Sequence, residues 1–343
     1  MSVETSHRYQ NIPEHLSSIQ SPAADRAETT SNRKPIVPRV RSFSWSLDGR
    51  SIPLGFGCAH LGNTGRSDYS QKDELDLLMR SYESGMRYYD TSRTYHESEV
   101  VVGEFIRRID RKTIFLATKS MYPFREQKGF SVFKDNFYRS FERLQTDHID
   151  LFQIHDTDSF NICEAEVMPF LIEQRSRGLI DYIGIGTRSL NALELALLSG
   201  EIDSVLSYMN FSLLKRSAEP VIRLAHDIGA SFVNASLLHF GAIKEPDPLT
   251  AAAGKQGYIR RTYIRAAAMR DLCREMGIDP VVASLQYGLF EPGVTMTLNG
   301  IRRQANLEAT LAAMRQVIHP EQWARIYQLQ NQDPCLRTQD DLL

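Results

Sequence analysis

The stretch MRYYDTSRTY, residues 86–95, predicts a short β-strand that runs directly into a polar loop. Its strand part contains Tyr88 and Tyr89, aromatic residues of the kind that favours strands. Its loop part brings the carboxyl group of Asp90 and the phenol of Tyr95 close together along the chain. The decisive pattern is therefore an apolar strand that delivers ionisable side chains at its carboxyl end.

Two later apolar segments end in the same way. Residues 114–118 are followed by Lys119, and residues 149–154 are followed by His155. In a parallel barrel the carboxyl ends of all strands lie on one face, and that face holds the active site. We therefore expect Asp90, Tyr95, Lys119 and His155 to meet on this face.

The rest of the chain alternates predicted strands with predicted helices. Apolar residues at i, i+3, i+4 and i+7, such as Leu75, Leu78, Met79 and Tyr82, indicate the helices. The eight strands are expected near residues 55–58, 86–90, 114–118, 149–154, 182–186, 205–209, 231–235 and 294–298. Strict alternation favours an α/β fold, a (β/α)8 TIM barrel. A doubly wound open sheet is the alternative, but its usual G-x-G-x-x-G run is not found.

The two flanks of the barrel pattern differ in composition. Asp48-Gly49 between alternating residues predicts an N-terminal β-hairpin. Residues 1–40 are rich in Ser, Thr, Pro and charge, which predicts a flexible, disordered tail and leaves residues 41–343 as a single barrel domain. Residues 240–261 show no clear periodicity, so they are expected to form either a flap over the site or a mobile excursion.

Composition excludes several classes of protein. The 343 residues carry a formal net charge of -2 with no basic run, which argues against nucleic-acid binding. No apolar run approaches the ~20 residues that span a bilayer, so no membrane association is expected. Four cysteines without a Cys-x-x-Cys pair predict reduced thiols and a cytoplasmic location. No metal site is expected, and the oligomeric state is left open.

The four ionisable groups suit proton transfer to an oxygen whose carbon gains or loses hydride. A phenol with a pKa of ~10 is a poor acid or base at neutral pH, and a nearby ammonium is expected to lower that pKa. A carboxylate keeps the lysine charged, and an imidazole can orient the reacting oxygen. Each residue alone has a simpler explanation, as a turn former, a buried aromatic, a solvated charge or a loop histidine. Their joint occurrence at strand ends favours catalysis.

These motifs resemble the aldo-keto reductase superfamily. The resemblance rests on residues 90–95 with Ser98-Glu99, on Lys119 in Ala-Thr-Lys, on residues 150–155, and on residues 178–186 as a fifth-strand signature. It implies a TIM barrel, a cofactor that is NAD or NADP bound without a Rossmann domain, and a tetrad with Tyr95 as acid/base. Residues 205–210 and 233–238 resemble the sugar-oxidising branch, the L-galactose dehydrogenase and aldose 1-dehydrogenase-like proteins.

The resemblance also implies further site residues. Those expected to bind cofactor are Gly57, Asp90, Thr187, Arg188, Ser207, Ser236, Leu238, Gly300, Arg302, Arg303 and Asn306. Arg93 and His96 stand where the family usually has Pro and Gly, so they are expected to line the substrate pocket.

Several of these positions depart from the family pattern. Thr187-Arg188 replaces a common Ser-Asn pair, and Gly300 and Asn306 replace phosphate-gripping Lys and Arg. Because Gly300 and Asn306 carry no positive charge, the sequence favours NAD over NADP. Arg302 and Arg303 could still meet a phosphate, or could form a solvated first helical turn.

We expect an NAD(P)-dependent oxidoreductase that interconverts a carbonyl or sugar lactone and an alcohol or hemiacetal, with a small-molecule carbonyl compound or sugar as its partner. The alternative is a catalytically weak, cofactor-binding regulatory protein on the same fold, which the tail and His96 motivate. A non-redox enzyme that reuses the pocket is a third possibility.

Overall fold

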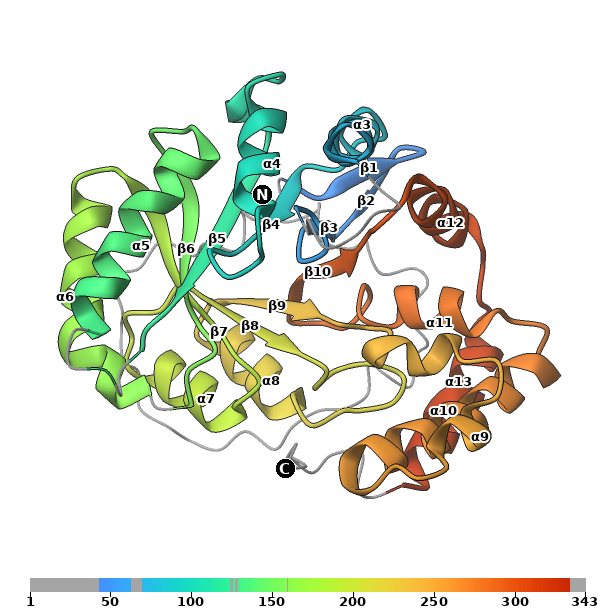
Figure 1. Ribbon diagram of the computed structural model, residues 1–343. Helices are drawn as coiled ribbons and strands as arrows, with labels where there is room; N and C mark the ends of the chain where they lie inside the picture. The colour runs from blue at the N-terminus through green and yellow to red at the C-terminus, as the bar shows by residue number, and fades with distance from the viewer. Residues whose placement is uncertain (1–42, 63–69, 124–125, 127–128, 159, 334–343) are drawn as a thin grey trace, which may run out of the picture.

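The computed structural model describes residues 43–333 except 63–69, 124–125, 127–128 and 159. In this part of the chain, eight parallel strands close into a barrel with neighbours in the order β10-β3-β4-β5-β6-β7-β8-β9, surrounded by helices (Figure 1). The strands are β3 (Leu54–Gly57), β4 (Tyr88–Asp90), β5 (Phe115–Met121), β6 (Ile149–His155), β7 (Ile180–Gly186), β8 (Ser204–Tyr208), β9 (Ser231–Ala235) and β10 (Val294–Gly300). The predicted (β/α)8 barrel is confirmed.

Helices follow the strands in the expected alternation. They are α3 (Gln71–Glu83), α4 (Ser98–Ile106), α5 (Gly129–Leu144), α6 (Phe160–Ser176), α7 (Leu190–Leu198), α8 (Glu219–Asp227), α9 (Pro248–Ala252), α10 (Gly257–Glu275), α11 (Pro280–Tyr287), α12 (Gln304–Arg315) and α13 (Pro320–Asn331). Two short 3-10 helices are η1 (Arg111–Thr113) and η2 (His239–Lys244).

The predicted N-terminal hairpin is confirmed. Strands β1 (Trp45–Leu47) and β2 (Arg50–Ile52) pair antiparallel around Asp48 and Gly49. Both turn residues have positive φ, 51° and 76°, as a two-residue hairpin turn of this kind requires. Asp48 also receives a hydrogen bond from Arg315 of α12 at 3.0 Å, so the hairpin is tied to the last barrel unit.

The apolar core has two parts. One fills the barrel and consists of Tyr88, Phe115, Ala117, Leu151, Leu206, Val233, Met296 and Leu298. The other is formed by side chains of the strands and of the surrounding helices, such as Phe152, Phe133 and Phe137. Since the interior is filled by side chains, the barrel is a packed scaffold that leaves the strand ends for chemistry.

The segment 240–261 differs from the expectation of a loop without periodicity. It contains η2, the short helix α9 and the start of α10. Asp247 caps α9 by accepting a hydrogen bond from the backbone N–H of Thr250, and Pro248 is the first helical residue. Proline at that position starts a helix rather than breaking one, which is why the expectation of an irregular loop was wrong.

The expected flexible tail, residues 1–40, lies outside the described residues. The division of the chain into that tail and one domain over residues 41–343 therefore stays a prediction.

Phe137 on α5 joins the outer helices to the barrel. Its ring centroid lies 4.6 Å from that of Phe152 in β6 and 5.1 Å from that of Phe170 in α6. The side chain is fully buried. It therefore belongs to the aromatic contact on which the packing of α5 and α6 against the barrel depends.

We expect Phe137→Ala to lower the free energy of unfolding by about 3–5 kcal/mol, because a buried ring is replaced by a cavity. Chemical denaturation followed by circular dichroism measures this change. Val132→Ala on the exposed face of α5 is the matched control, expected to stay within about 0.5 kcal/mol of wild type. Equal, small effects of both substitutions would contradict the packing role of Phe137.

Candidate active site

Three adjacent strands bring the predicted tetrad together. Asp90 ends β4, Lys119 lies near the end of β5, and His155 ends β6. The register pairs Asp90 with Ala117 and Lys119 with Gln153, so all three side chains reach the same end of the barrel. Tyr95 follows in the loop between β4 and α4.

Asp90 and Lys119 form a buried ion pair. The Nζ atom of Lys119 lies 2.5 Å from Oδ1 of Asp90 and also donates to the backbone oxygen of Thr91 at 2.9 Å. Gln153 donates to the other carboxylate oxygen of Asp90 at 3.1 Å. Burial opposes the charge on Lys119, but Asp90 and Tyr95 outweigh it and raise the pKa of the ammonium. Lys119 is therefore a fixed positive charge.

Tyr95 lies between the ammonium and the imidazole. Lys119 Nζ is 4.9 Å from the centroid of the tyrosine ring, and the ring of His155 meets it edge-on at 5.6 Å. Burial raises the pKa of Tyr95, and the opposing effect of Lys119 is smaller. The expectation of a net lowering was therefore wrong for this molecule. Tyr95 keeps its proton at neutral pH and is available as a proton donor.

His155 is held as a neutral imidazole. Its Nδ1 atom lies 2.9 Å from Oγ of Ser92 and 3.2 Å from Oγ1 of Thr94. Burial and the nearby charge of Lys119 lower the pKa of His155 to about 3. Both hydroxyls come from the loop after β4, and apart from membership of the motif no sequence signal indicated their contact with His155.

Arg93 and His96, the expected substrate contacts, lie in the same loop. Arg93 is half-buried, its backbone N–H donates to the oxygen of Lys119 at 2.9 Å, and His96 is exposed. The backbones of both residues therefore lie next to the tetrad, and the guanidinium of Arg93 is close enough to the buried Glu99 to offset part of the rise that burial causes in the pKa of that carboxyl group.

A single arginine of α5 secures this loop. Arg143 donates to the backbone oxygen of His96 at 2.8 Å, and its guanidinium pairs with Glu97 at 3.1 Å and with Glu99 at 3.2 Å. Glu99 is buried and accepts a hydrogen bond from Thr118 of β5 at 2.8 Å. The loop that carries Tyr95 is therefore fixed to both an outer helix and a barrel strand.

Backbone strain gathers at this end of the barrel. Of the eight non-glycine residues with positive φ in the described ranges, six lie in the segments that connect a barrel strand to the next long helix, two of them in η2. The six are His96, Asp156, Met209, Ser236, His239 and Phe240. Conformations of this kind cost energy and concentrate at functional sites. The positions of these residues therefore indicate that this face is the functional one, and this evidence does not depend on the motifs.

The residues expected to bind cofactor occupy the same face. Gly57 ends β3, Ser207 lies in β8, and Gly300 ends β10. Those in the connecting segments are Thr187 and Arg188 after β7, Ser236 and Leu238 after β9, and Arg302, Arg303 and Asn306 around the start of α12. The structure therefore brings the set together with Asp90 around one rim.

Asn210 organises part of that rim and was not predicted as a site residue. Its side-chain Nδ2 donates to the backbone oxygen of Arg188 and to Oγ of Ser207, both at 2.9 Å. It is buried. Because one amide joins the loops after β7 and β8, their polar groups are held at fixed positions relative to each other.

The donor groups fit a nicotinamide dinucleotide. Arg303 precedes α12 without a side-chain cap, so the first helical N–H groups and the exposed Arg302 could hold a phosphate. The guanidinium of Arg188 stacks over the ring of Tyr258 at 4.6 Å, and its buried Nε has no hydrogen-bond partner among the described residues.

A second cluster of ionisable groups lies at the opposite end of the strands. His148, Asp150 and Asp181 offer ligand atoms within 4.8 Å of one another. Asp150 accepts hydrogen bonds from Arg111 at 2.7 Å and from the backbone N–H of Leu116 at 2.9 Å. These contacts, and that of His148 with Asp181 at 3.2 Å, explain the cluster as a network that ties strand starts together.

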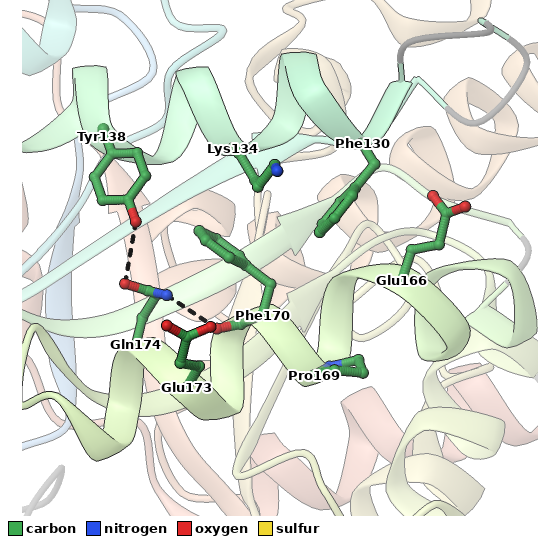
Figure 2. Close-up of a pocket in the computed structure, with 8 residues that line it drawn as sticks. All are labelled: Phe130, Lys134, Tyr138, Glu166, Pro169, Phe170, Glu173 and Gln174. Carbon is green, nitrogen blue, oxygen red and sulfur yellow. Dashed lines mark hydrogen bonds between the residues drawn. The ribbon is translucent and has the colours of Figure 1, made fainter.

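A groove of about 570 Å³ lies between α5 and α6, in the outer helical layer (Figure 2). Tyr138 donates to Gln174 at 3.3 Å, and Lys134 lies over the ring of Phe130 at 4.7 Å. The lining of the groove contains none of the tetrad residues, so the groove is separate from the candidate active site.

No helix in the described ranges combines the length and apolar character needed to cross a bilayer.

Comparisons with known proteins identify the family of this chain. A sequence model of the aldo/keto reductase family matches residues 53–331. The chain therefore belongs to the aldo/keto reductase family, a family of oxidoreductases.

Individual relatives are distant. D-threo-aldose 1-dehydrogenase from Pseudomonas sp is 25% identical over 291 residues, which covers 76% of this chain and 88% of that protein. L-galactose dehydrogenase from Arabidopsis thaliana is 23% identical over 279 residues, covering 77% and 84%. The holo form of aldo-keto reductase AKR11C1 from Bacillus halodurans has a TM-score of 0.67 at 23% identity, covering 83% of this chain and 95% of that one. This structural likeness supports the fold.

The pKa of His155 predicts a specific pH dependence of stability. The pKa is about 3 in the folded chain and about 6.5 in an unfolded one. Between about pH 3 and pH 6.5, the unfolded chain therefore binds a proton that the folded chain does not bind. Stability is fully present above pH 6.5 and is lost as the pH falls toward 3. We expect the stability of wild type relative to His155→Asn to fall by about 1 kcal/mol between pH 6 and pH 5. Urea denaturation at both pH values measures it, and parallel changes in the two proteins would contradict the low pKa.

Proposed function

We propose that this chain is an NAD(P)-dependent oxidoreductase that interconverts a carbonyl compound, or a sugar lactone, with an alcohol or hemiacetal. Tyr95 acts as the general acid/base. The single observation that supports this most directly is the placement of Tyr95 between the charged Lys119 and the neutral His155. When bound, the nicotinamide would supply or accept the hydride.

In the reducing direction, the hydroxyl of Tyr95 donates its proton to the carbonyl oxygen. The charge that develops on the phenol is stabilised by Lys119, whose own charge is maintained by Asp90 at 2.5 Å. In the oxidising direction the same phenolate accepts the proton from a hydroxyl group, as removal of hydride from a hemiacetal carbon requires.

His155 orients the reacting oxygen. Because its pKa is about 3, the imidazole is neutral and can carry one proton on Nε2, while Nδ1 stays with the hydroxyls of Ser92 and Thr94. A neutral donor polarises a carbonyl oxygen without competing with Tyr95 for the role of acid.

The remaining proposed contacts divide along the rim. The residues that would hold the cofactor on this rim are Gly57, Asp90, Thr187, Arg188, Ser207, Ser236 and Leu238, together with Gly300, Arg302, Arg303 and Asn306, of which the two arginines would supply positive charge for its phosphates. Arg93 and His96 contact the substrate. The names of the two sugar-oxidising relatives support a sugar as substrate.

We expect Tyr95→Phe to lower kcat by about 100-fold or more, because proton transfer loses its donor. The cofactor Kd is expected to stay within about threefold of wild type, since the ring remains. Reduced-nicotinamide absorbance measures turnover on aldehydes and sugars, and fluorescence titration measures Kd.

Tyr138→Phe, an exposed tyrosine on α5, is the matched control and should leave both values unchanged. Unchanged turnover in Tyr95→Phe would refute the proposed mechanism. A wild type that retains cofactor without turnover on any substrate would favour the regulatory alternative.

For the cofactor, we expect wild type to bind NAD more tightly than NADP, because Gly300 and Asn306 cannot pair with a 2′-phosphate by charge. Arg302→Ala is expected to weaken NAD binding by about 10-fold through loss of a pyrophosphate contact. Isothermal titration calorimetry measures both. Arg315→Ala, at the other end of α12, is the control. A loss confined to NADP would instead place Arg302 at the 2′-phosphate.

A further inference from the structure

Asp156 is an unexpected acidic residue beside the tetrad. It follows His155 at the end of β6, and its backbone N–H donates to the oxygen of Gly186 at 2.8 Å. Its φ is 48°, a left-handed conformation for which glycine is the default. Aspartate is one of the few residues with a side chain that adopts this conformation at modest cost, and residues in it gather at binding sites.

The carboxylate of Asp156 lies next to Tyr208, the last residue of β8, and to His155 of the tetrad. Oδ1 accepts a hydrogen bond from the hydroxyl of Tyr208 at 3.1 Å, and Oδ2 lies 3.5 Å from Nε2 of His155. Its side chain is 39% exposed, so a ligand can reach it.

Most of its acceptor capacity is unused. An ionised carboxylate offers about four acceptor positions, of which Tyr208 uses one. The distance to His155 is too long for a strong hydrogen bond. In the described part of the chain, no lysine or arginine forms an ion pair with Asp156. The remaining positions are available to hydrogen-bond donors on a ligand.

Asp156 lies close to the position where the reacting oxygen of the substrate is proposed to bind. Nδ1 of His155 is held by Ser92, so Nε2 is the nitrogen left for the substrate oxygen, and Asp156 lies beside it. The negative charge of Asp156 is close enough to Tyr95 to raise the pKa of its phenol. A substrate whose oxygen lies between Tyr95 and His155 therefore brings its neighbouring carbons toward Asp156.

We propose that Asp156 is a specificity-determining residue that accepts hydrogen bonds from substrate hydroxyl groups next to the reacting carbon, with Tyr208 holding its carboxylate in place. The inference rests on the proposed function and deepens it, because it selects polyhydroxylated carbonyl compounds such as aldoses. A carboxylate accepts from hydroxyl donors and repels anions, so the same subsite disfavours substrates that carry a carboxylate there.

The test compares Asp156→Asn with wild type in the full chain, using D-glyceraldehyde and a pentose against butanal, which has no hydroxyl group. For both hydroxylated substrates we expect KM to rise about 10-fold or more, because hydrogen bonds to a charged acceptor are lost. For butanal, KM should stay within about threefold, because this substrate has no hydroxyl group to lose a contact, and its kcat is the reference for any change that loss of the charge causes at Tyr95. Tyr208→Phe should raise the pentose KM by a smaller factor, since the carboxylate remains. Asp158→Asn, an exposed acid two residues further on, should change nothing.

The outcomes separate this inference from the proposed function. Equal losses on hydroxylated substrates and butanal would show that Asp156 only positions His155, and an unchanged pentose KM would show that its carboxylate is unused. Either result overturns the inference, as does a wild type active on butanal but on neither hydroxylated substrate. A wild type that binds cofactor but turns over none of the three compounds would overturn the proposed function itself.

Discussion

The ion pair between Asp90 and Lys119 is the interaction on which the rest of the site depends. Removing two charges from water costs several kcal/mol for each ion, and only close contact and further hydrogen bonds offset that cost. The structure supplies both, through the 2.5 Å contact, the oxygen of Thr91 and the amide of Gln153. Because removal of one partner would leave a buried charge alone, the two residues act as a unit.

That fixed positive charge determines the protonation of its neighbours. The ammonium lowers the pKa of Tyr95, although burial raises that pKa by more. At His155 the ammonium and burial act in the same direction, and both lower the pKa. One ammonium therefore lowers the cost of forming the phenolate and prevents a second positive charge nearby. The proposed chemistry needs both effects, since a charged imidazole would compete with Tyr95 as the acid.

Much of the fold and of the tetrad could be predicted from the sequence. The tetrad residues lie at or just beyond strand ends, and the alternation of strands and helices is enough to locate the carboxyl face of the barrel. The barrel, the hairpin at Asp48-Gly49 and the convergence of the tetrad residues follow from that pattern. The helices within residues 240–261 were missed because a proline at a helix start was interpreted as a loop signal.

The net pKa of Tyr95 could not be predicted in the same way, because it is a balance between burial and charge that depends on distances. Asp156 was missed for a related reason. Its position beside His155 depends on a left-handed backbone conformation that residue type alone does not reveal.

The contacts of Arg143 have a consequence for how the site responds to change elsewhere. One guanidinium on α5 holds the backbone of His96 and the carboxylates of Glu97 and Glu99, so the outer helix and the phenol-bearing loop are mechanically coupled. A shift of α5 on the outside of the molecule would be transmitted through these three contacts to the loop that carries Tyr95, the proposed proton donor. The outer helical layer of this barrel thus contributes to the alignment of the phenol oxygen of Tyr95 without contacting it.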